Sequence, residues 1–84
     1  MKIEAKVTKL TDGGKTKALA SIIIEDAVKI DGIRVMDGAN GLFVSMPSKK
    51  DEKAEKGYRD VAYPITKEAR ELVQQTVLDA YNKA

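Results

Sequence analysis

The strongest constraint on the fold is a change of hydrophobic period at Pro64. Before this proline, short apolar runs that alternate at period two are separated by turn residues, which is typical of antiparallel strands. After it, apolar residues recur at intervals of three and four through two repeats, which is typical of one amphipathic helix. Strands followed by a single helix predict an α+β fold: a small antiparallel sheet of about four to six strands, with the C-terminal helix packed on or beside it.

The first two strands are predicted from contrasting patterns. Residues 2–8 alternate strictly between polar and apolar side chains, which indicates a half-buried strand. The turn residues at 11–15 then predict a hairpin. The following run, 17–25, is apolar on both faces, so we expect a central strand that is covered on both sides.

The middle of the chain allows two interpretations. Apolar segments at 28–30 and 33–36 lie on either side of Asp31 and Gly32. They predict either a tight hairpin or one bent strand with a glycine bulge, and the pattern leaves both open. Residues 37–41 predict a further turn.

The last strands flank a charged segment. Residues 42–46 predict a short strand that Pro47 ends, and Phe43 within it is expected in the core. Residues 48–57 are polar and predict a flexible loop, after which residues 58–63 resume strand character until Pro64.

A helix is expected over about 67–82, with Thr66 as its N-cap. The apolar face predicted from the 3.6 period contains Ala69, Leu72, Val73, Thr76, Val77, Ala80 and Tyr81.

Length and composition limit the possible functions. The chain has 84 residues, which predicts one domain over 1–84, with the sheet at about 2–63 and the helix at about 67–82. It contains neither cysteine nor histidine, the usual thiolate ligand and general base. We therefore expect no enzymatic activity, cofactor, metal or small-molecule substrate. A core this small often gains support from oligomerisation, so we expect a homodimer.

The sequence also predicts where the protein resides. No stretch approaches the ~20 apolar residues of a membrane span, and no signal-peptide core is visible. We expect a cytoplasmic protein without a membrane partner.

The clearest binding chemistry is basic, although the net charge is only +2. Lys49 and Lys50 follow Pro47, and Arg59 follows the charged segment. These cations could contact phosphates, but interleaved carboxylates equally allow a solvated loop of mixed charge.

On the predicted helix, Lys67, Arg70 and Gln74 lie along one flank of the apolar stripe. They could form a basic edge that touches nucleic acid, or Lys67 could pair with Glu71 as an ordinary surface ion pair. A further cation, Arg34, could lie on a solvent face or pair with Asp37, Asp60 or Glu25, and we expect the structural ion pair.

Two segments resemble one protein family. The run IRVMDGANGLFVSMPSKK at 33–50 resembles the central signature of the SpoVG family, the stage V sporulation protein G regulators of bacteria. The run YRDVAYPIT at 58–66 resembles its second signature. The resemblance spans nearly the whole chain. It implies a dimeric DNA- and RNA-binding regulator, linked to septation, sporulation and gene expression, with a small sheet and a C-terminal helix.

The resemblance also implies contact residues. Family members use basic residues after the Pro-Ser step and in the helix, which correspond to Lys49, Lys50 and Arg70. We add Lys67 and Arg59 from their positions in this sequence. The mixed-charge loop 51–56 replaces a shorter turn found in many members. A second departure is a tyrosine before the Pro-Ile pair, where many members have histidine. We expect these two departures from the family pattern to affect the target sequence and the strength of nucleic-acid binding.

The sequence therefore predicts a nucleic-acid-binding regulator that acts as a homodimer. The alternative is a protein-interaction module that regulates septation through a protein partner docked on an exposed sheet edge.

Overall fold

The computed structural model describes residues 1–11 and 14–83. The elements within these residues run in the order β1 (Ile3–Lys9), β2 (Thr16–Ile24), β3 (Val28–Gly38), β4 (Gly41–Ser45), β5 (Ser48–Lys50), β6 (Tyr58–Asp60) and α1 (Lys67–Lys83). This α+β fold confirms the predicted class. Residues 12 and 13, part of the predicted turn at 11–15, lie outside the described residues.

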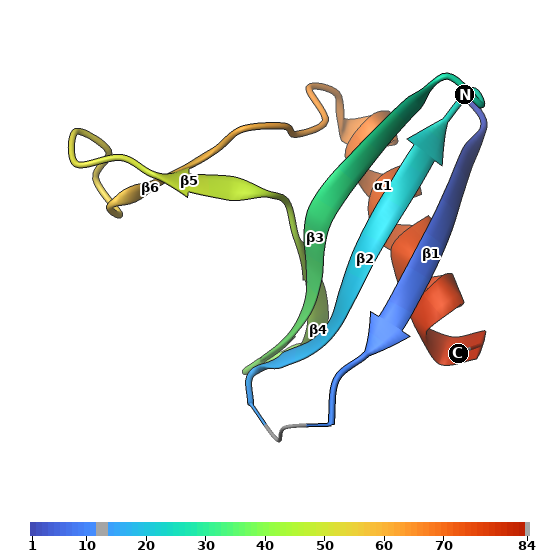
Figure 1. The fold of residues 1–84 in the computed structure, drawn as a ribbon, viewed down its shortest axis with the longest axis horizontal. Helices are drawn as coiled ribbons and strands as arrows, with labels where there is room; N and C mark the ends of the chain where they lie inside the picture. Colours follow the sequence, from blue (N-terminus) through green and yellow to red (C-terminus); the bar gives the residue numbers. More distant parts are fainter. Residues whose placement is uncertain (12–13, 84) are drawn as a thin grey trace.

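Strands β1 to β4 form one antiparallel sheet in sequence order. The single helix α1 lies across one face of this sheet, behind it in the view of Figure 1. Consecutive antiparallel neighbours need only short connections, which matches the turn residues between the runs. This sheet and its helix are called the body below.

The core lies between the sheet and α1. Alternate residues of β2 and β3 point to the helix, and residues four apart on α1 point back. The buried side chains among the described residues are Ala18, Ala20, Ile22, Ile33, Val35, Val73 and Val77. Full burial of a valine or isoleucine stabilises a fold by about 1.5–3 kcal/mol, so this small set holds the body together.

A bulge resolves the two interpretations of residues 28–36. Ala20 pairs with Ile33, but Ile22 pairs with Ile30, so β3 contains one residue more than β2 between these pairs. Gly32 has a φ of +82° there, which glycine adopts without steric cost. The segment is therefore one bent strand and not a hairpin.

The opposite face of the sheet is open, which corrects two predictions. Leu19 of β2 is 46% exposed, and Phe43 of β4 is 44% exposed. Central strand β2 is thus covered on one side only, and Phe43 is not a core residue. Both errors share a cause: one helix of this length can cover only one face of the sheet, and an apolar side chain alone does not reveal which face it occupies.

Helix α1 begins close to its predicted start. The backbone N–H of Ala69 donates a hydrogen bond to Oγ1 of Thr66 at 3.1 Å, which confirms the N-cap. The apolar stripe is rotated slightly from the prediction. Leu72 is exposed, whereas Leu78 packs against the core.

Strands β5 and β6 form a separate two-stranded hairpin, called the arm below. It projects away from both the sheet and α1 in Figure 1. The segment predicted as a loop at 48–57 therefore begins as a strand, and only residues 51–57 form the turn region. The predicted strand at 58–63 is shorter, because pairing ends at Asp60.

Candidate nucleic-acid interface

The arm places two cations opposite each other. Lys49 of β5 pairs with Arg59 of β6 in the antiparallel register, so both side chains lie on the same face of the hairpin. Like charges in this position destabilise a strand pair. An external anion bound between the two side chains would relieve that repulsion, so this pair is the most suggestive feature of the arm.

Arg59 has one internal partner. Its Nε lies 3.6 Å from Oδ2 of Asp51, and the Arg59 side chain remains 67% exposed. An ion pair this exposed contributes about 0–1 kcal/mol. Arg59 can therefore exchange the Asp51 carboxylate for a phosphate at little cost.

The second face of the arm combines a cation with an aromatic ring. Lys50 pairs with Tyr58 across the strands, and Tyr58 is 63% exposed. An exposed ring beside a lysine provides a stacking surface for a base next to a contact for its phosphate.

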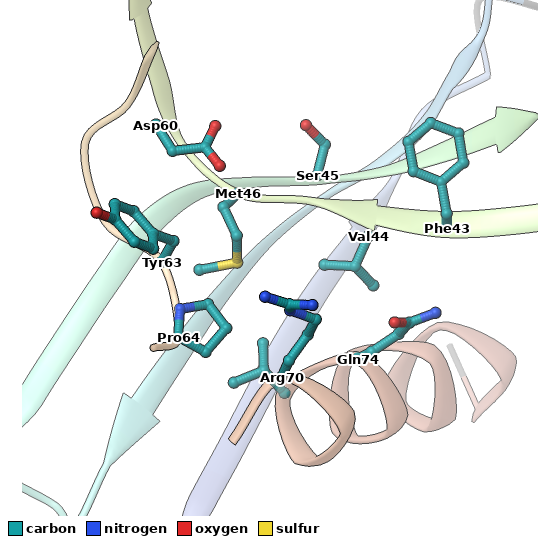
Figure 2. A pocket seen from close by; sticks show the side chains of 10 residues that line it. Phe43, Val44, Ser45, Met46, Asp60, Tyr63, Pro64, Arg70 and Gln74 are labelled. Atoms are coloured by element: carbon teal, nitrogen blue, oxygen red, sulfur yellow. The ribbon is translucent and has the colours of Figure 1, made fainter. Parts of the chain in front are cut away.

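Arg70 extends from the helix toward the base of the arm. It lines a cavity of about 410 Å³ between β4, α1 and the segment that joins the arm to the helix. Figure 2 shows its guanidinium directed from α1 toward β4, with Gln74 one turn further along the helix. Asp60, at the base of the arm, lines the same cavity, so Arg70 lies beside the arm and its surroundings include one carboxylate.

Lys67 occupies the first turn of α1. It lies three residues before Arg70, which places both on one side of the helix, but it does not line the Arg70 cavity. The expected alternative, a pair with Glu71, does not form. Lys67 remains an exposed cation in the first turn of α1.

The predicted contact residues are mostly free of internal ion pairs. Within the described part of the chain, those without a salt bridge are Lys49, Lys50, Lys67 and Arg70. Arg34, for which we predicted a structural ion pair, also has no salt-bridge partner among the described residues and is exposed on β3. That prediction is wrong because the register places Arg34 opposite Leu19 and Ser45, on the open face.

The electrostatics of the body differ from those of the arm. A hydrogen bond from Nζ of Lys2 to Asp26, together with the charge of Glu4, raises the pKa of Lys2 above its usual value of 10.5. This cluster stabilises the hairpin between β2 and β3, far from the arm in Figure 1. Lys2 therefore has internal ionic partners, whereas the arm lysines Lys49 and Lys50 have none among the described residues.

Sequence reasoning missed the surroundings of Arg70. The cavity also includes Ser45, Met46 and Tyr63, which come from segments distant in sequence from α1. These residues come together only because β4 and the segment after the arm both pass beside α1, and no local sequence pattern predicts that arrangement.

No helix in the described part of the chain is long and apolar enough to cross a membrane.

Comparison with known proteins identifies the family. The SpoVG family model matches residues 1–83. The chain belongs to the SpoVG family. Relatives named "Putative septation protein SpoVG" include one from Desulforudis audaxviator, 42% identical over 93% of this chain and 86% of its own. One from Clostridioides difficile is 42% identical over 100% of this chain and 90% of its own.

A third relative, from Macrococcus caseolyticus, is 43% identical over 95% of this chain and 68% of its own. The family assignment confirms the resemblance seen in the two signatures. The names of these SpoVG relatives refer to septation, and they state no enzymatic activity.

Proposed function

We propose that this SpoVG-family chain is a cytoplasmic regulatory protein that binds DNA and RNA as a homodimer and acts in septation and gene-expression control. The observation that supports it best is the cross-strand pair of Lys49 and Arg59 on a projecting arm. The two cations repel each other, and a phosphate bound between them would relieve that repulsion, as the Asp51 carboxylate beside Arg59 already does in part.

The other contacts extend this surface. Lys50 and Tyr58 offer a phosphate contact and a stacking ring on the second face of the arm. Arg70 lies beside the base of the arm, and Lys67 adds a cation in the first turn of α1. Phosphate contacts of this kind provide affinity largely independent of sequence. Two copies would double the number of cations, which compensates for a net charge of only +2 per chain.

The proposal is tested by removing the arm cations. In Lys49→Gln/Lys50→Gln, we expect affinity for duplex DNA, single-stranded DNA and RNA to fall by roughly tenfold or more, about 1.4 kcal/mol, by fluorescence anisotropy at low salt. The matched control, Lys6→Gln/Lys83→Gln, removes the same charge from the body. Equal losses in both variants, or no binding by the wild type, would overturn the proposal.

A second candidate function is docking to a protein partner that controls septation. The observation that favours it is the exposed apolar side chains along the arm and its return segment, Tyr58, Val61, Tyr63 and Ile65. Phosphate contacts do not require so many exposed apolar side chains, and exposed apolar surface is typical of protein-binding sites. If septation control survives in Lys49→Gln/Lys50→Gln while nucleic-acid binding is lost, this second function is favoured.

A further inference from the structure

The cavity beside Arg70 brings together two opposite charges that do not pair. This cavity of about 410 Å³ is lined by Arg70 of α1 and by Asp60 at the base of the arm. Neither side chain forms a hydrogen bond or a salt bridge to another described residue. Figure 2 shows the two groups on opposite sides of the end of β4. A ligand in this cavity would therefore meet a hydrogen-bond donor on one side and an acceptor on the other.

The surface between these two charges includes an exposed aromatic ring. Tyr63 is 60% exposed, and it lines the cavity together with Met46 and Pro64. Exposed aromatic rings stack on the flat faces of nucleobases. The volume of the cavity lies within the roughly 300–1,000 Å³ range of small-ligand sites. Its size and lining fit one flat ring that has polar edges.

We propose that this cavity binds one unpaired guanine nucleotide. The edges of guanine carry two adjacent acceptors, O6 and N7, and two adjacent donors, N1–H and the N2 amino group. Arg70 can donate to the two acceptors, which is the commonest specific contact to guanine. Asp60 can accept from the two donors with its two carboxylate oxygens. The other three bases lack two adjacent donors, so they match Asp60 less well.

The guanine must be unpaired because base pairing uses the same edge. In a duplex, cytosine bonds to the N1–H and N2 amino groups that Asp60 would bind. In a single strand these groups are free, and the base can turn outward onto an aromatic side chain. Gln74 lines the same cavity one helical turn after Arg70, and its amide can bond to the sugar or phosphate of the same nucleotide. The ligand is a guanine nucleotide, either within a single strand or free.

This site deepens the proposed function and rests on it for the single-stranded ligand. The arm cations contact phosphates whatever the base, whereas the cavity recognises one base. The two surfaces are continuous, because Asp60 is the last residue of β6 and also lines the cavity. A strand held by the arm could therefore place one of its guanines beside Tyr63.

The first experiment compares single strands that differ in one base. The probes are thymidine oligonucleotides of about twelve nucleotides, a length within the ~4–16 nucleotides of small single-strand sites. The central position is thymine, guanine, adenine or hypoxanthine. By fluorescence anisotropy at one salt concentration, we expect wild type to bind the guanine strand about tenfold more tightly than the all-thymidine strand. Hypoxanthine, which is guanine without the N2 amino group, should lose most of that gain.

Asp60→Asn separates base recognition from general electrostatics. The variant removes a negative charge, so its affinity for the all-thymidine strand should stay unchanged or rise. Its preference for guanine should fall to about twofold or less, because an amide cannot accept from both donors. The matched control is Asp37→Asn, which removes the same charge from an exposed site on β3 outside the cavity and should keep the tenfold preference. An unchanged preference in Asp60→Asn, or an equal loss in Asp37→Asn, overturns the site.

Free guanosine monophosphate distinguishes the failure of this site from the failure of the proposed function. In an NMR titration, we expect it to bind wild type with a dissociation constant of about 1 mM or below, more tightly than uridine monophosphate. Asp60→Asn should weaken that binding about tenfold. A guanine preference among strands without binding of the free nucleotide supports the site and assigns its ligand to the strand.

The remaining outcomes are equally distinct. Strands that bind without base preference, together with no binding of the free nucleotide, overturn the site and leave the proposed function intact. Binding of the free nucleotide that depends on Asp60, together with no binding of any strand, supports the site and overturns the proposed function. Binding of neither overturns both.

Discussion

The body and the arm of this chain differ in almost every physical respect. All buried core residues among the described residues belong to the body, whereas strands β5 and β6 are exposed throughout. The lysine with the clearest internal partners, Lys2, also belongs to the body, and the arm lysines Lys49 and Lys50 have none. The difference teaches that stability and most of the proposed nucleic-acid contacts lie in separate segments, so we expect that each can be altered without the other.

The largest effect should follow from damage to the body. Ile33→Ala removes a fully buried side chain beneath α1, and we expect a loss of about 2–5 kcal/mol in the free energy of unfolding, measured by urea denaturation. The neighbouring Arg34→Ala, on the open face, should change stability by no more than about 0.5 kcal/mol. Similar losses in the two variants would contradict the assignment of the core.

A smaller effect is expected at the junction between arm and body. Thr66→Ala removes the side-chain acceptor for the N–H of Ala69, and we expect a loss of about 1 kcal/mol in unfolding free energy. Thr66→Ser retains a hydroxyl and should lose less. We compare the two variants by thermal denaturation. Equal losses of stability in Thr66→Ala and Thr66→Ser would contradict the N-cap role of the Thr66 hydroxyl.

Within the arm, binding should be adjustable without a stability cost. Asp51→Asn releases Arg59 from its 3.6 Å contact, and we expect nucleic-acid affinity to rise about threefold, a gain within the ~0–1 kcal/mol range of surface ion pairs. Glu52→Gln removes the same charge from a described side chain that has no salt bridge to Arg59, and it should raise affinity less. The melting temperature should stay unchanged in both, and equal affinities would argue against a role for the Asp51–Arg59 pair.

The smallest effect concerns pH and the body. The pKa of Lys2 is raised above 10.5 by Asp26 and then by Glu4, so its ion pairs stabilise the fold fully below pH 10.5 and lose this contribution as pH rises through the raised pKa. Asp26→Asn should therefore melt slightly below the wild type at neutral pH, and the difference should shrink at high pH. A difference in melting temperature that grows with pH would contradict the stabilising role of the Lys2 ion pairs.

Local patterns in the sequence predicted the body well. The alternation at residues 2–8 and the 3.6 period after Pro64 each reflect one element with one buried face. The N-cap at Thr66 could be predicted because its hydrogen bond spans only three residues.

The failures concern relations that a local pattern does not encode. Phe43 and Leu19 are apolar, but only the position of α1 decides that their face of the sheet stays open. The arm was missed at 48–50 because its polar residues have no buried face, so no hydrophobic period marks it. The basic residues could be predicted, whereas the cross-strand meeting of Lys49 and Arg59 required the register.

The central claim is that the arm cations neutralise phosphates, and the salt dependence of duplex binding tests it most directly. For a dimer that neutralises about four to six phosphates, the log–log slope of affinity against salt should be about −3.6 to −5.4. Lys49→Gln/Lys50→Gln should reduce its magnitude by up to about 3.6, because two cations per chain are lost at ~0.9 each. A wild-type slope near zero, or identical slopes for the variant and the wild type, would contradict the account.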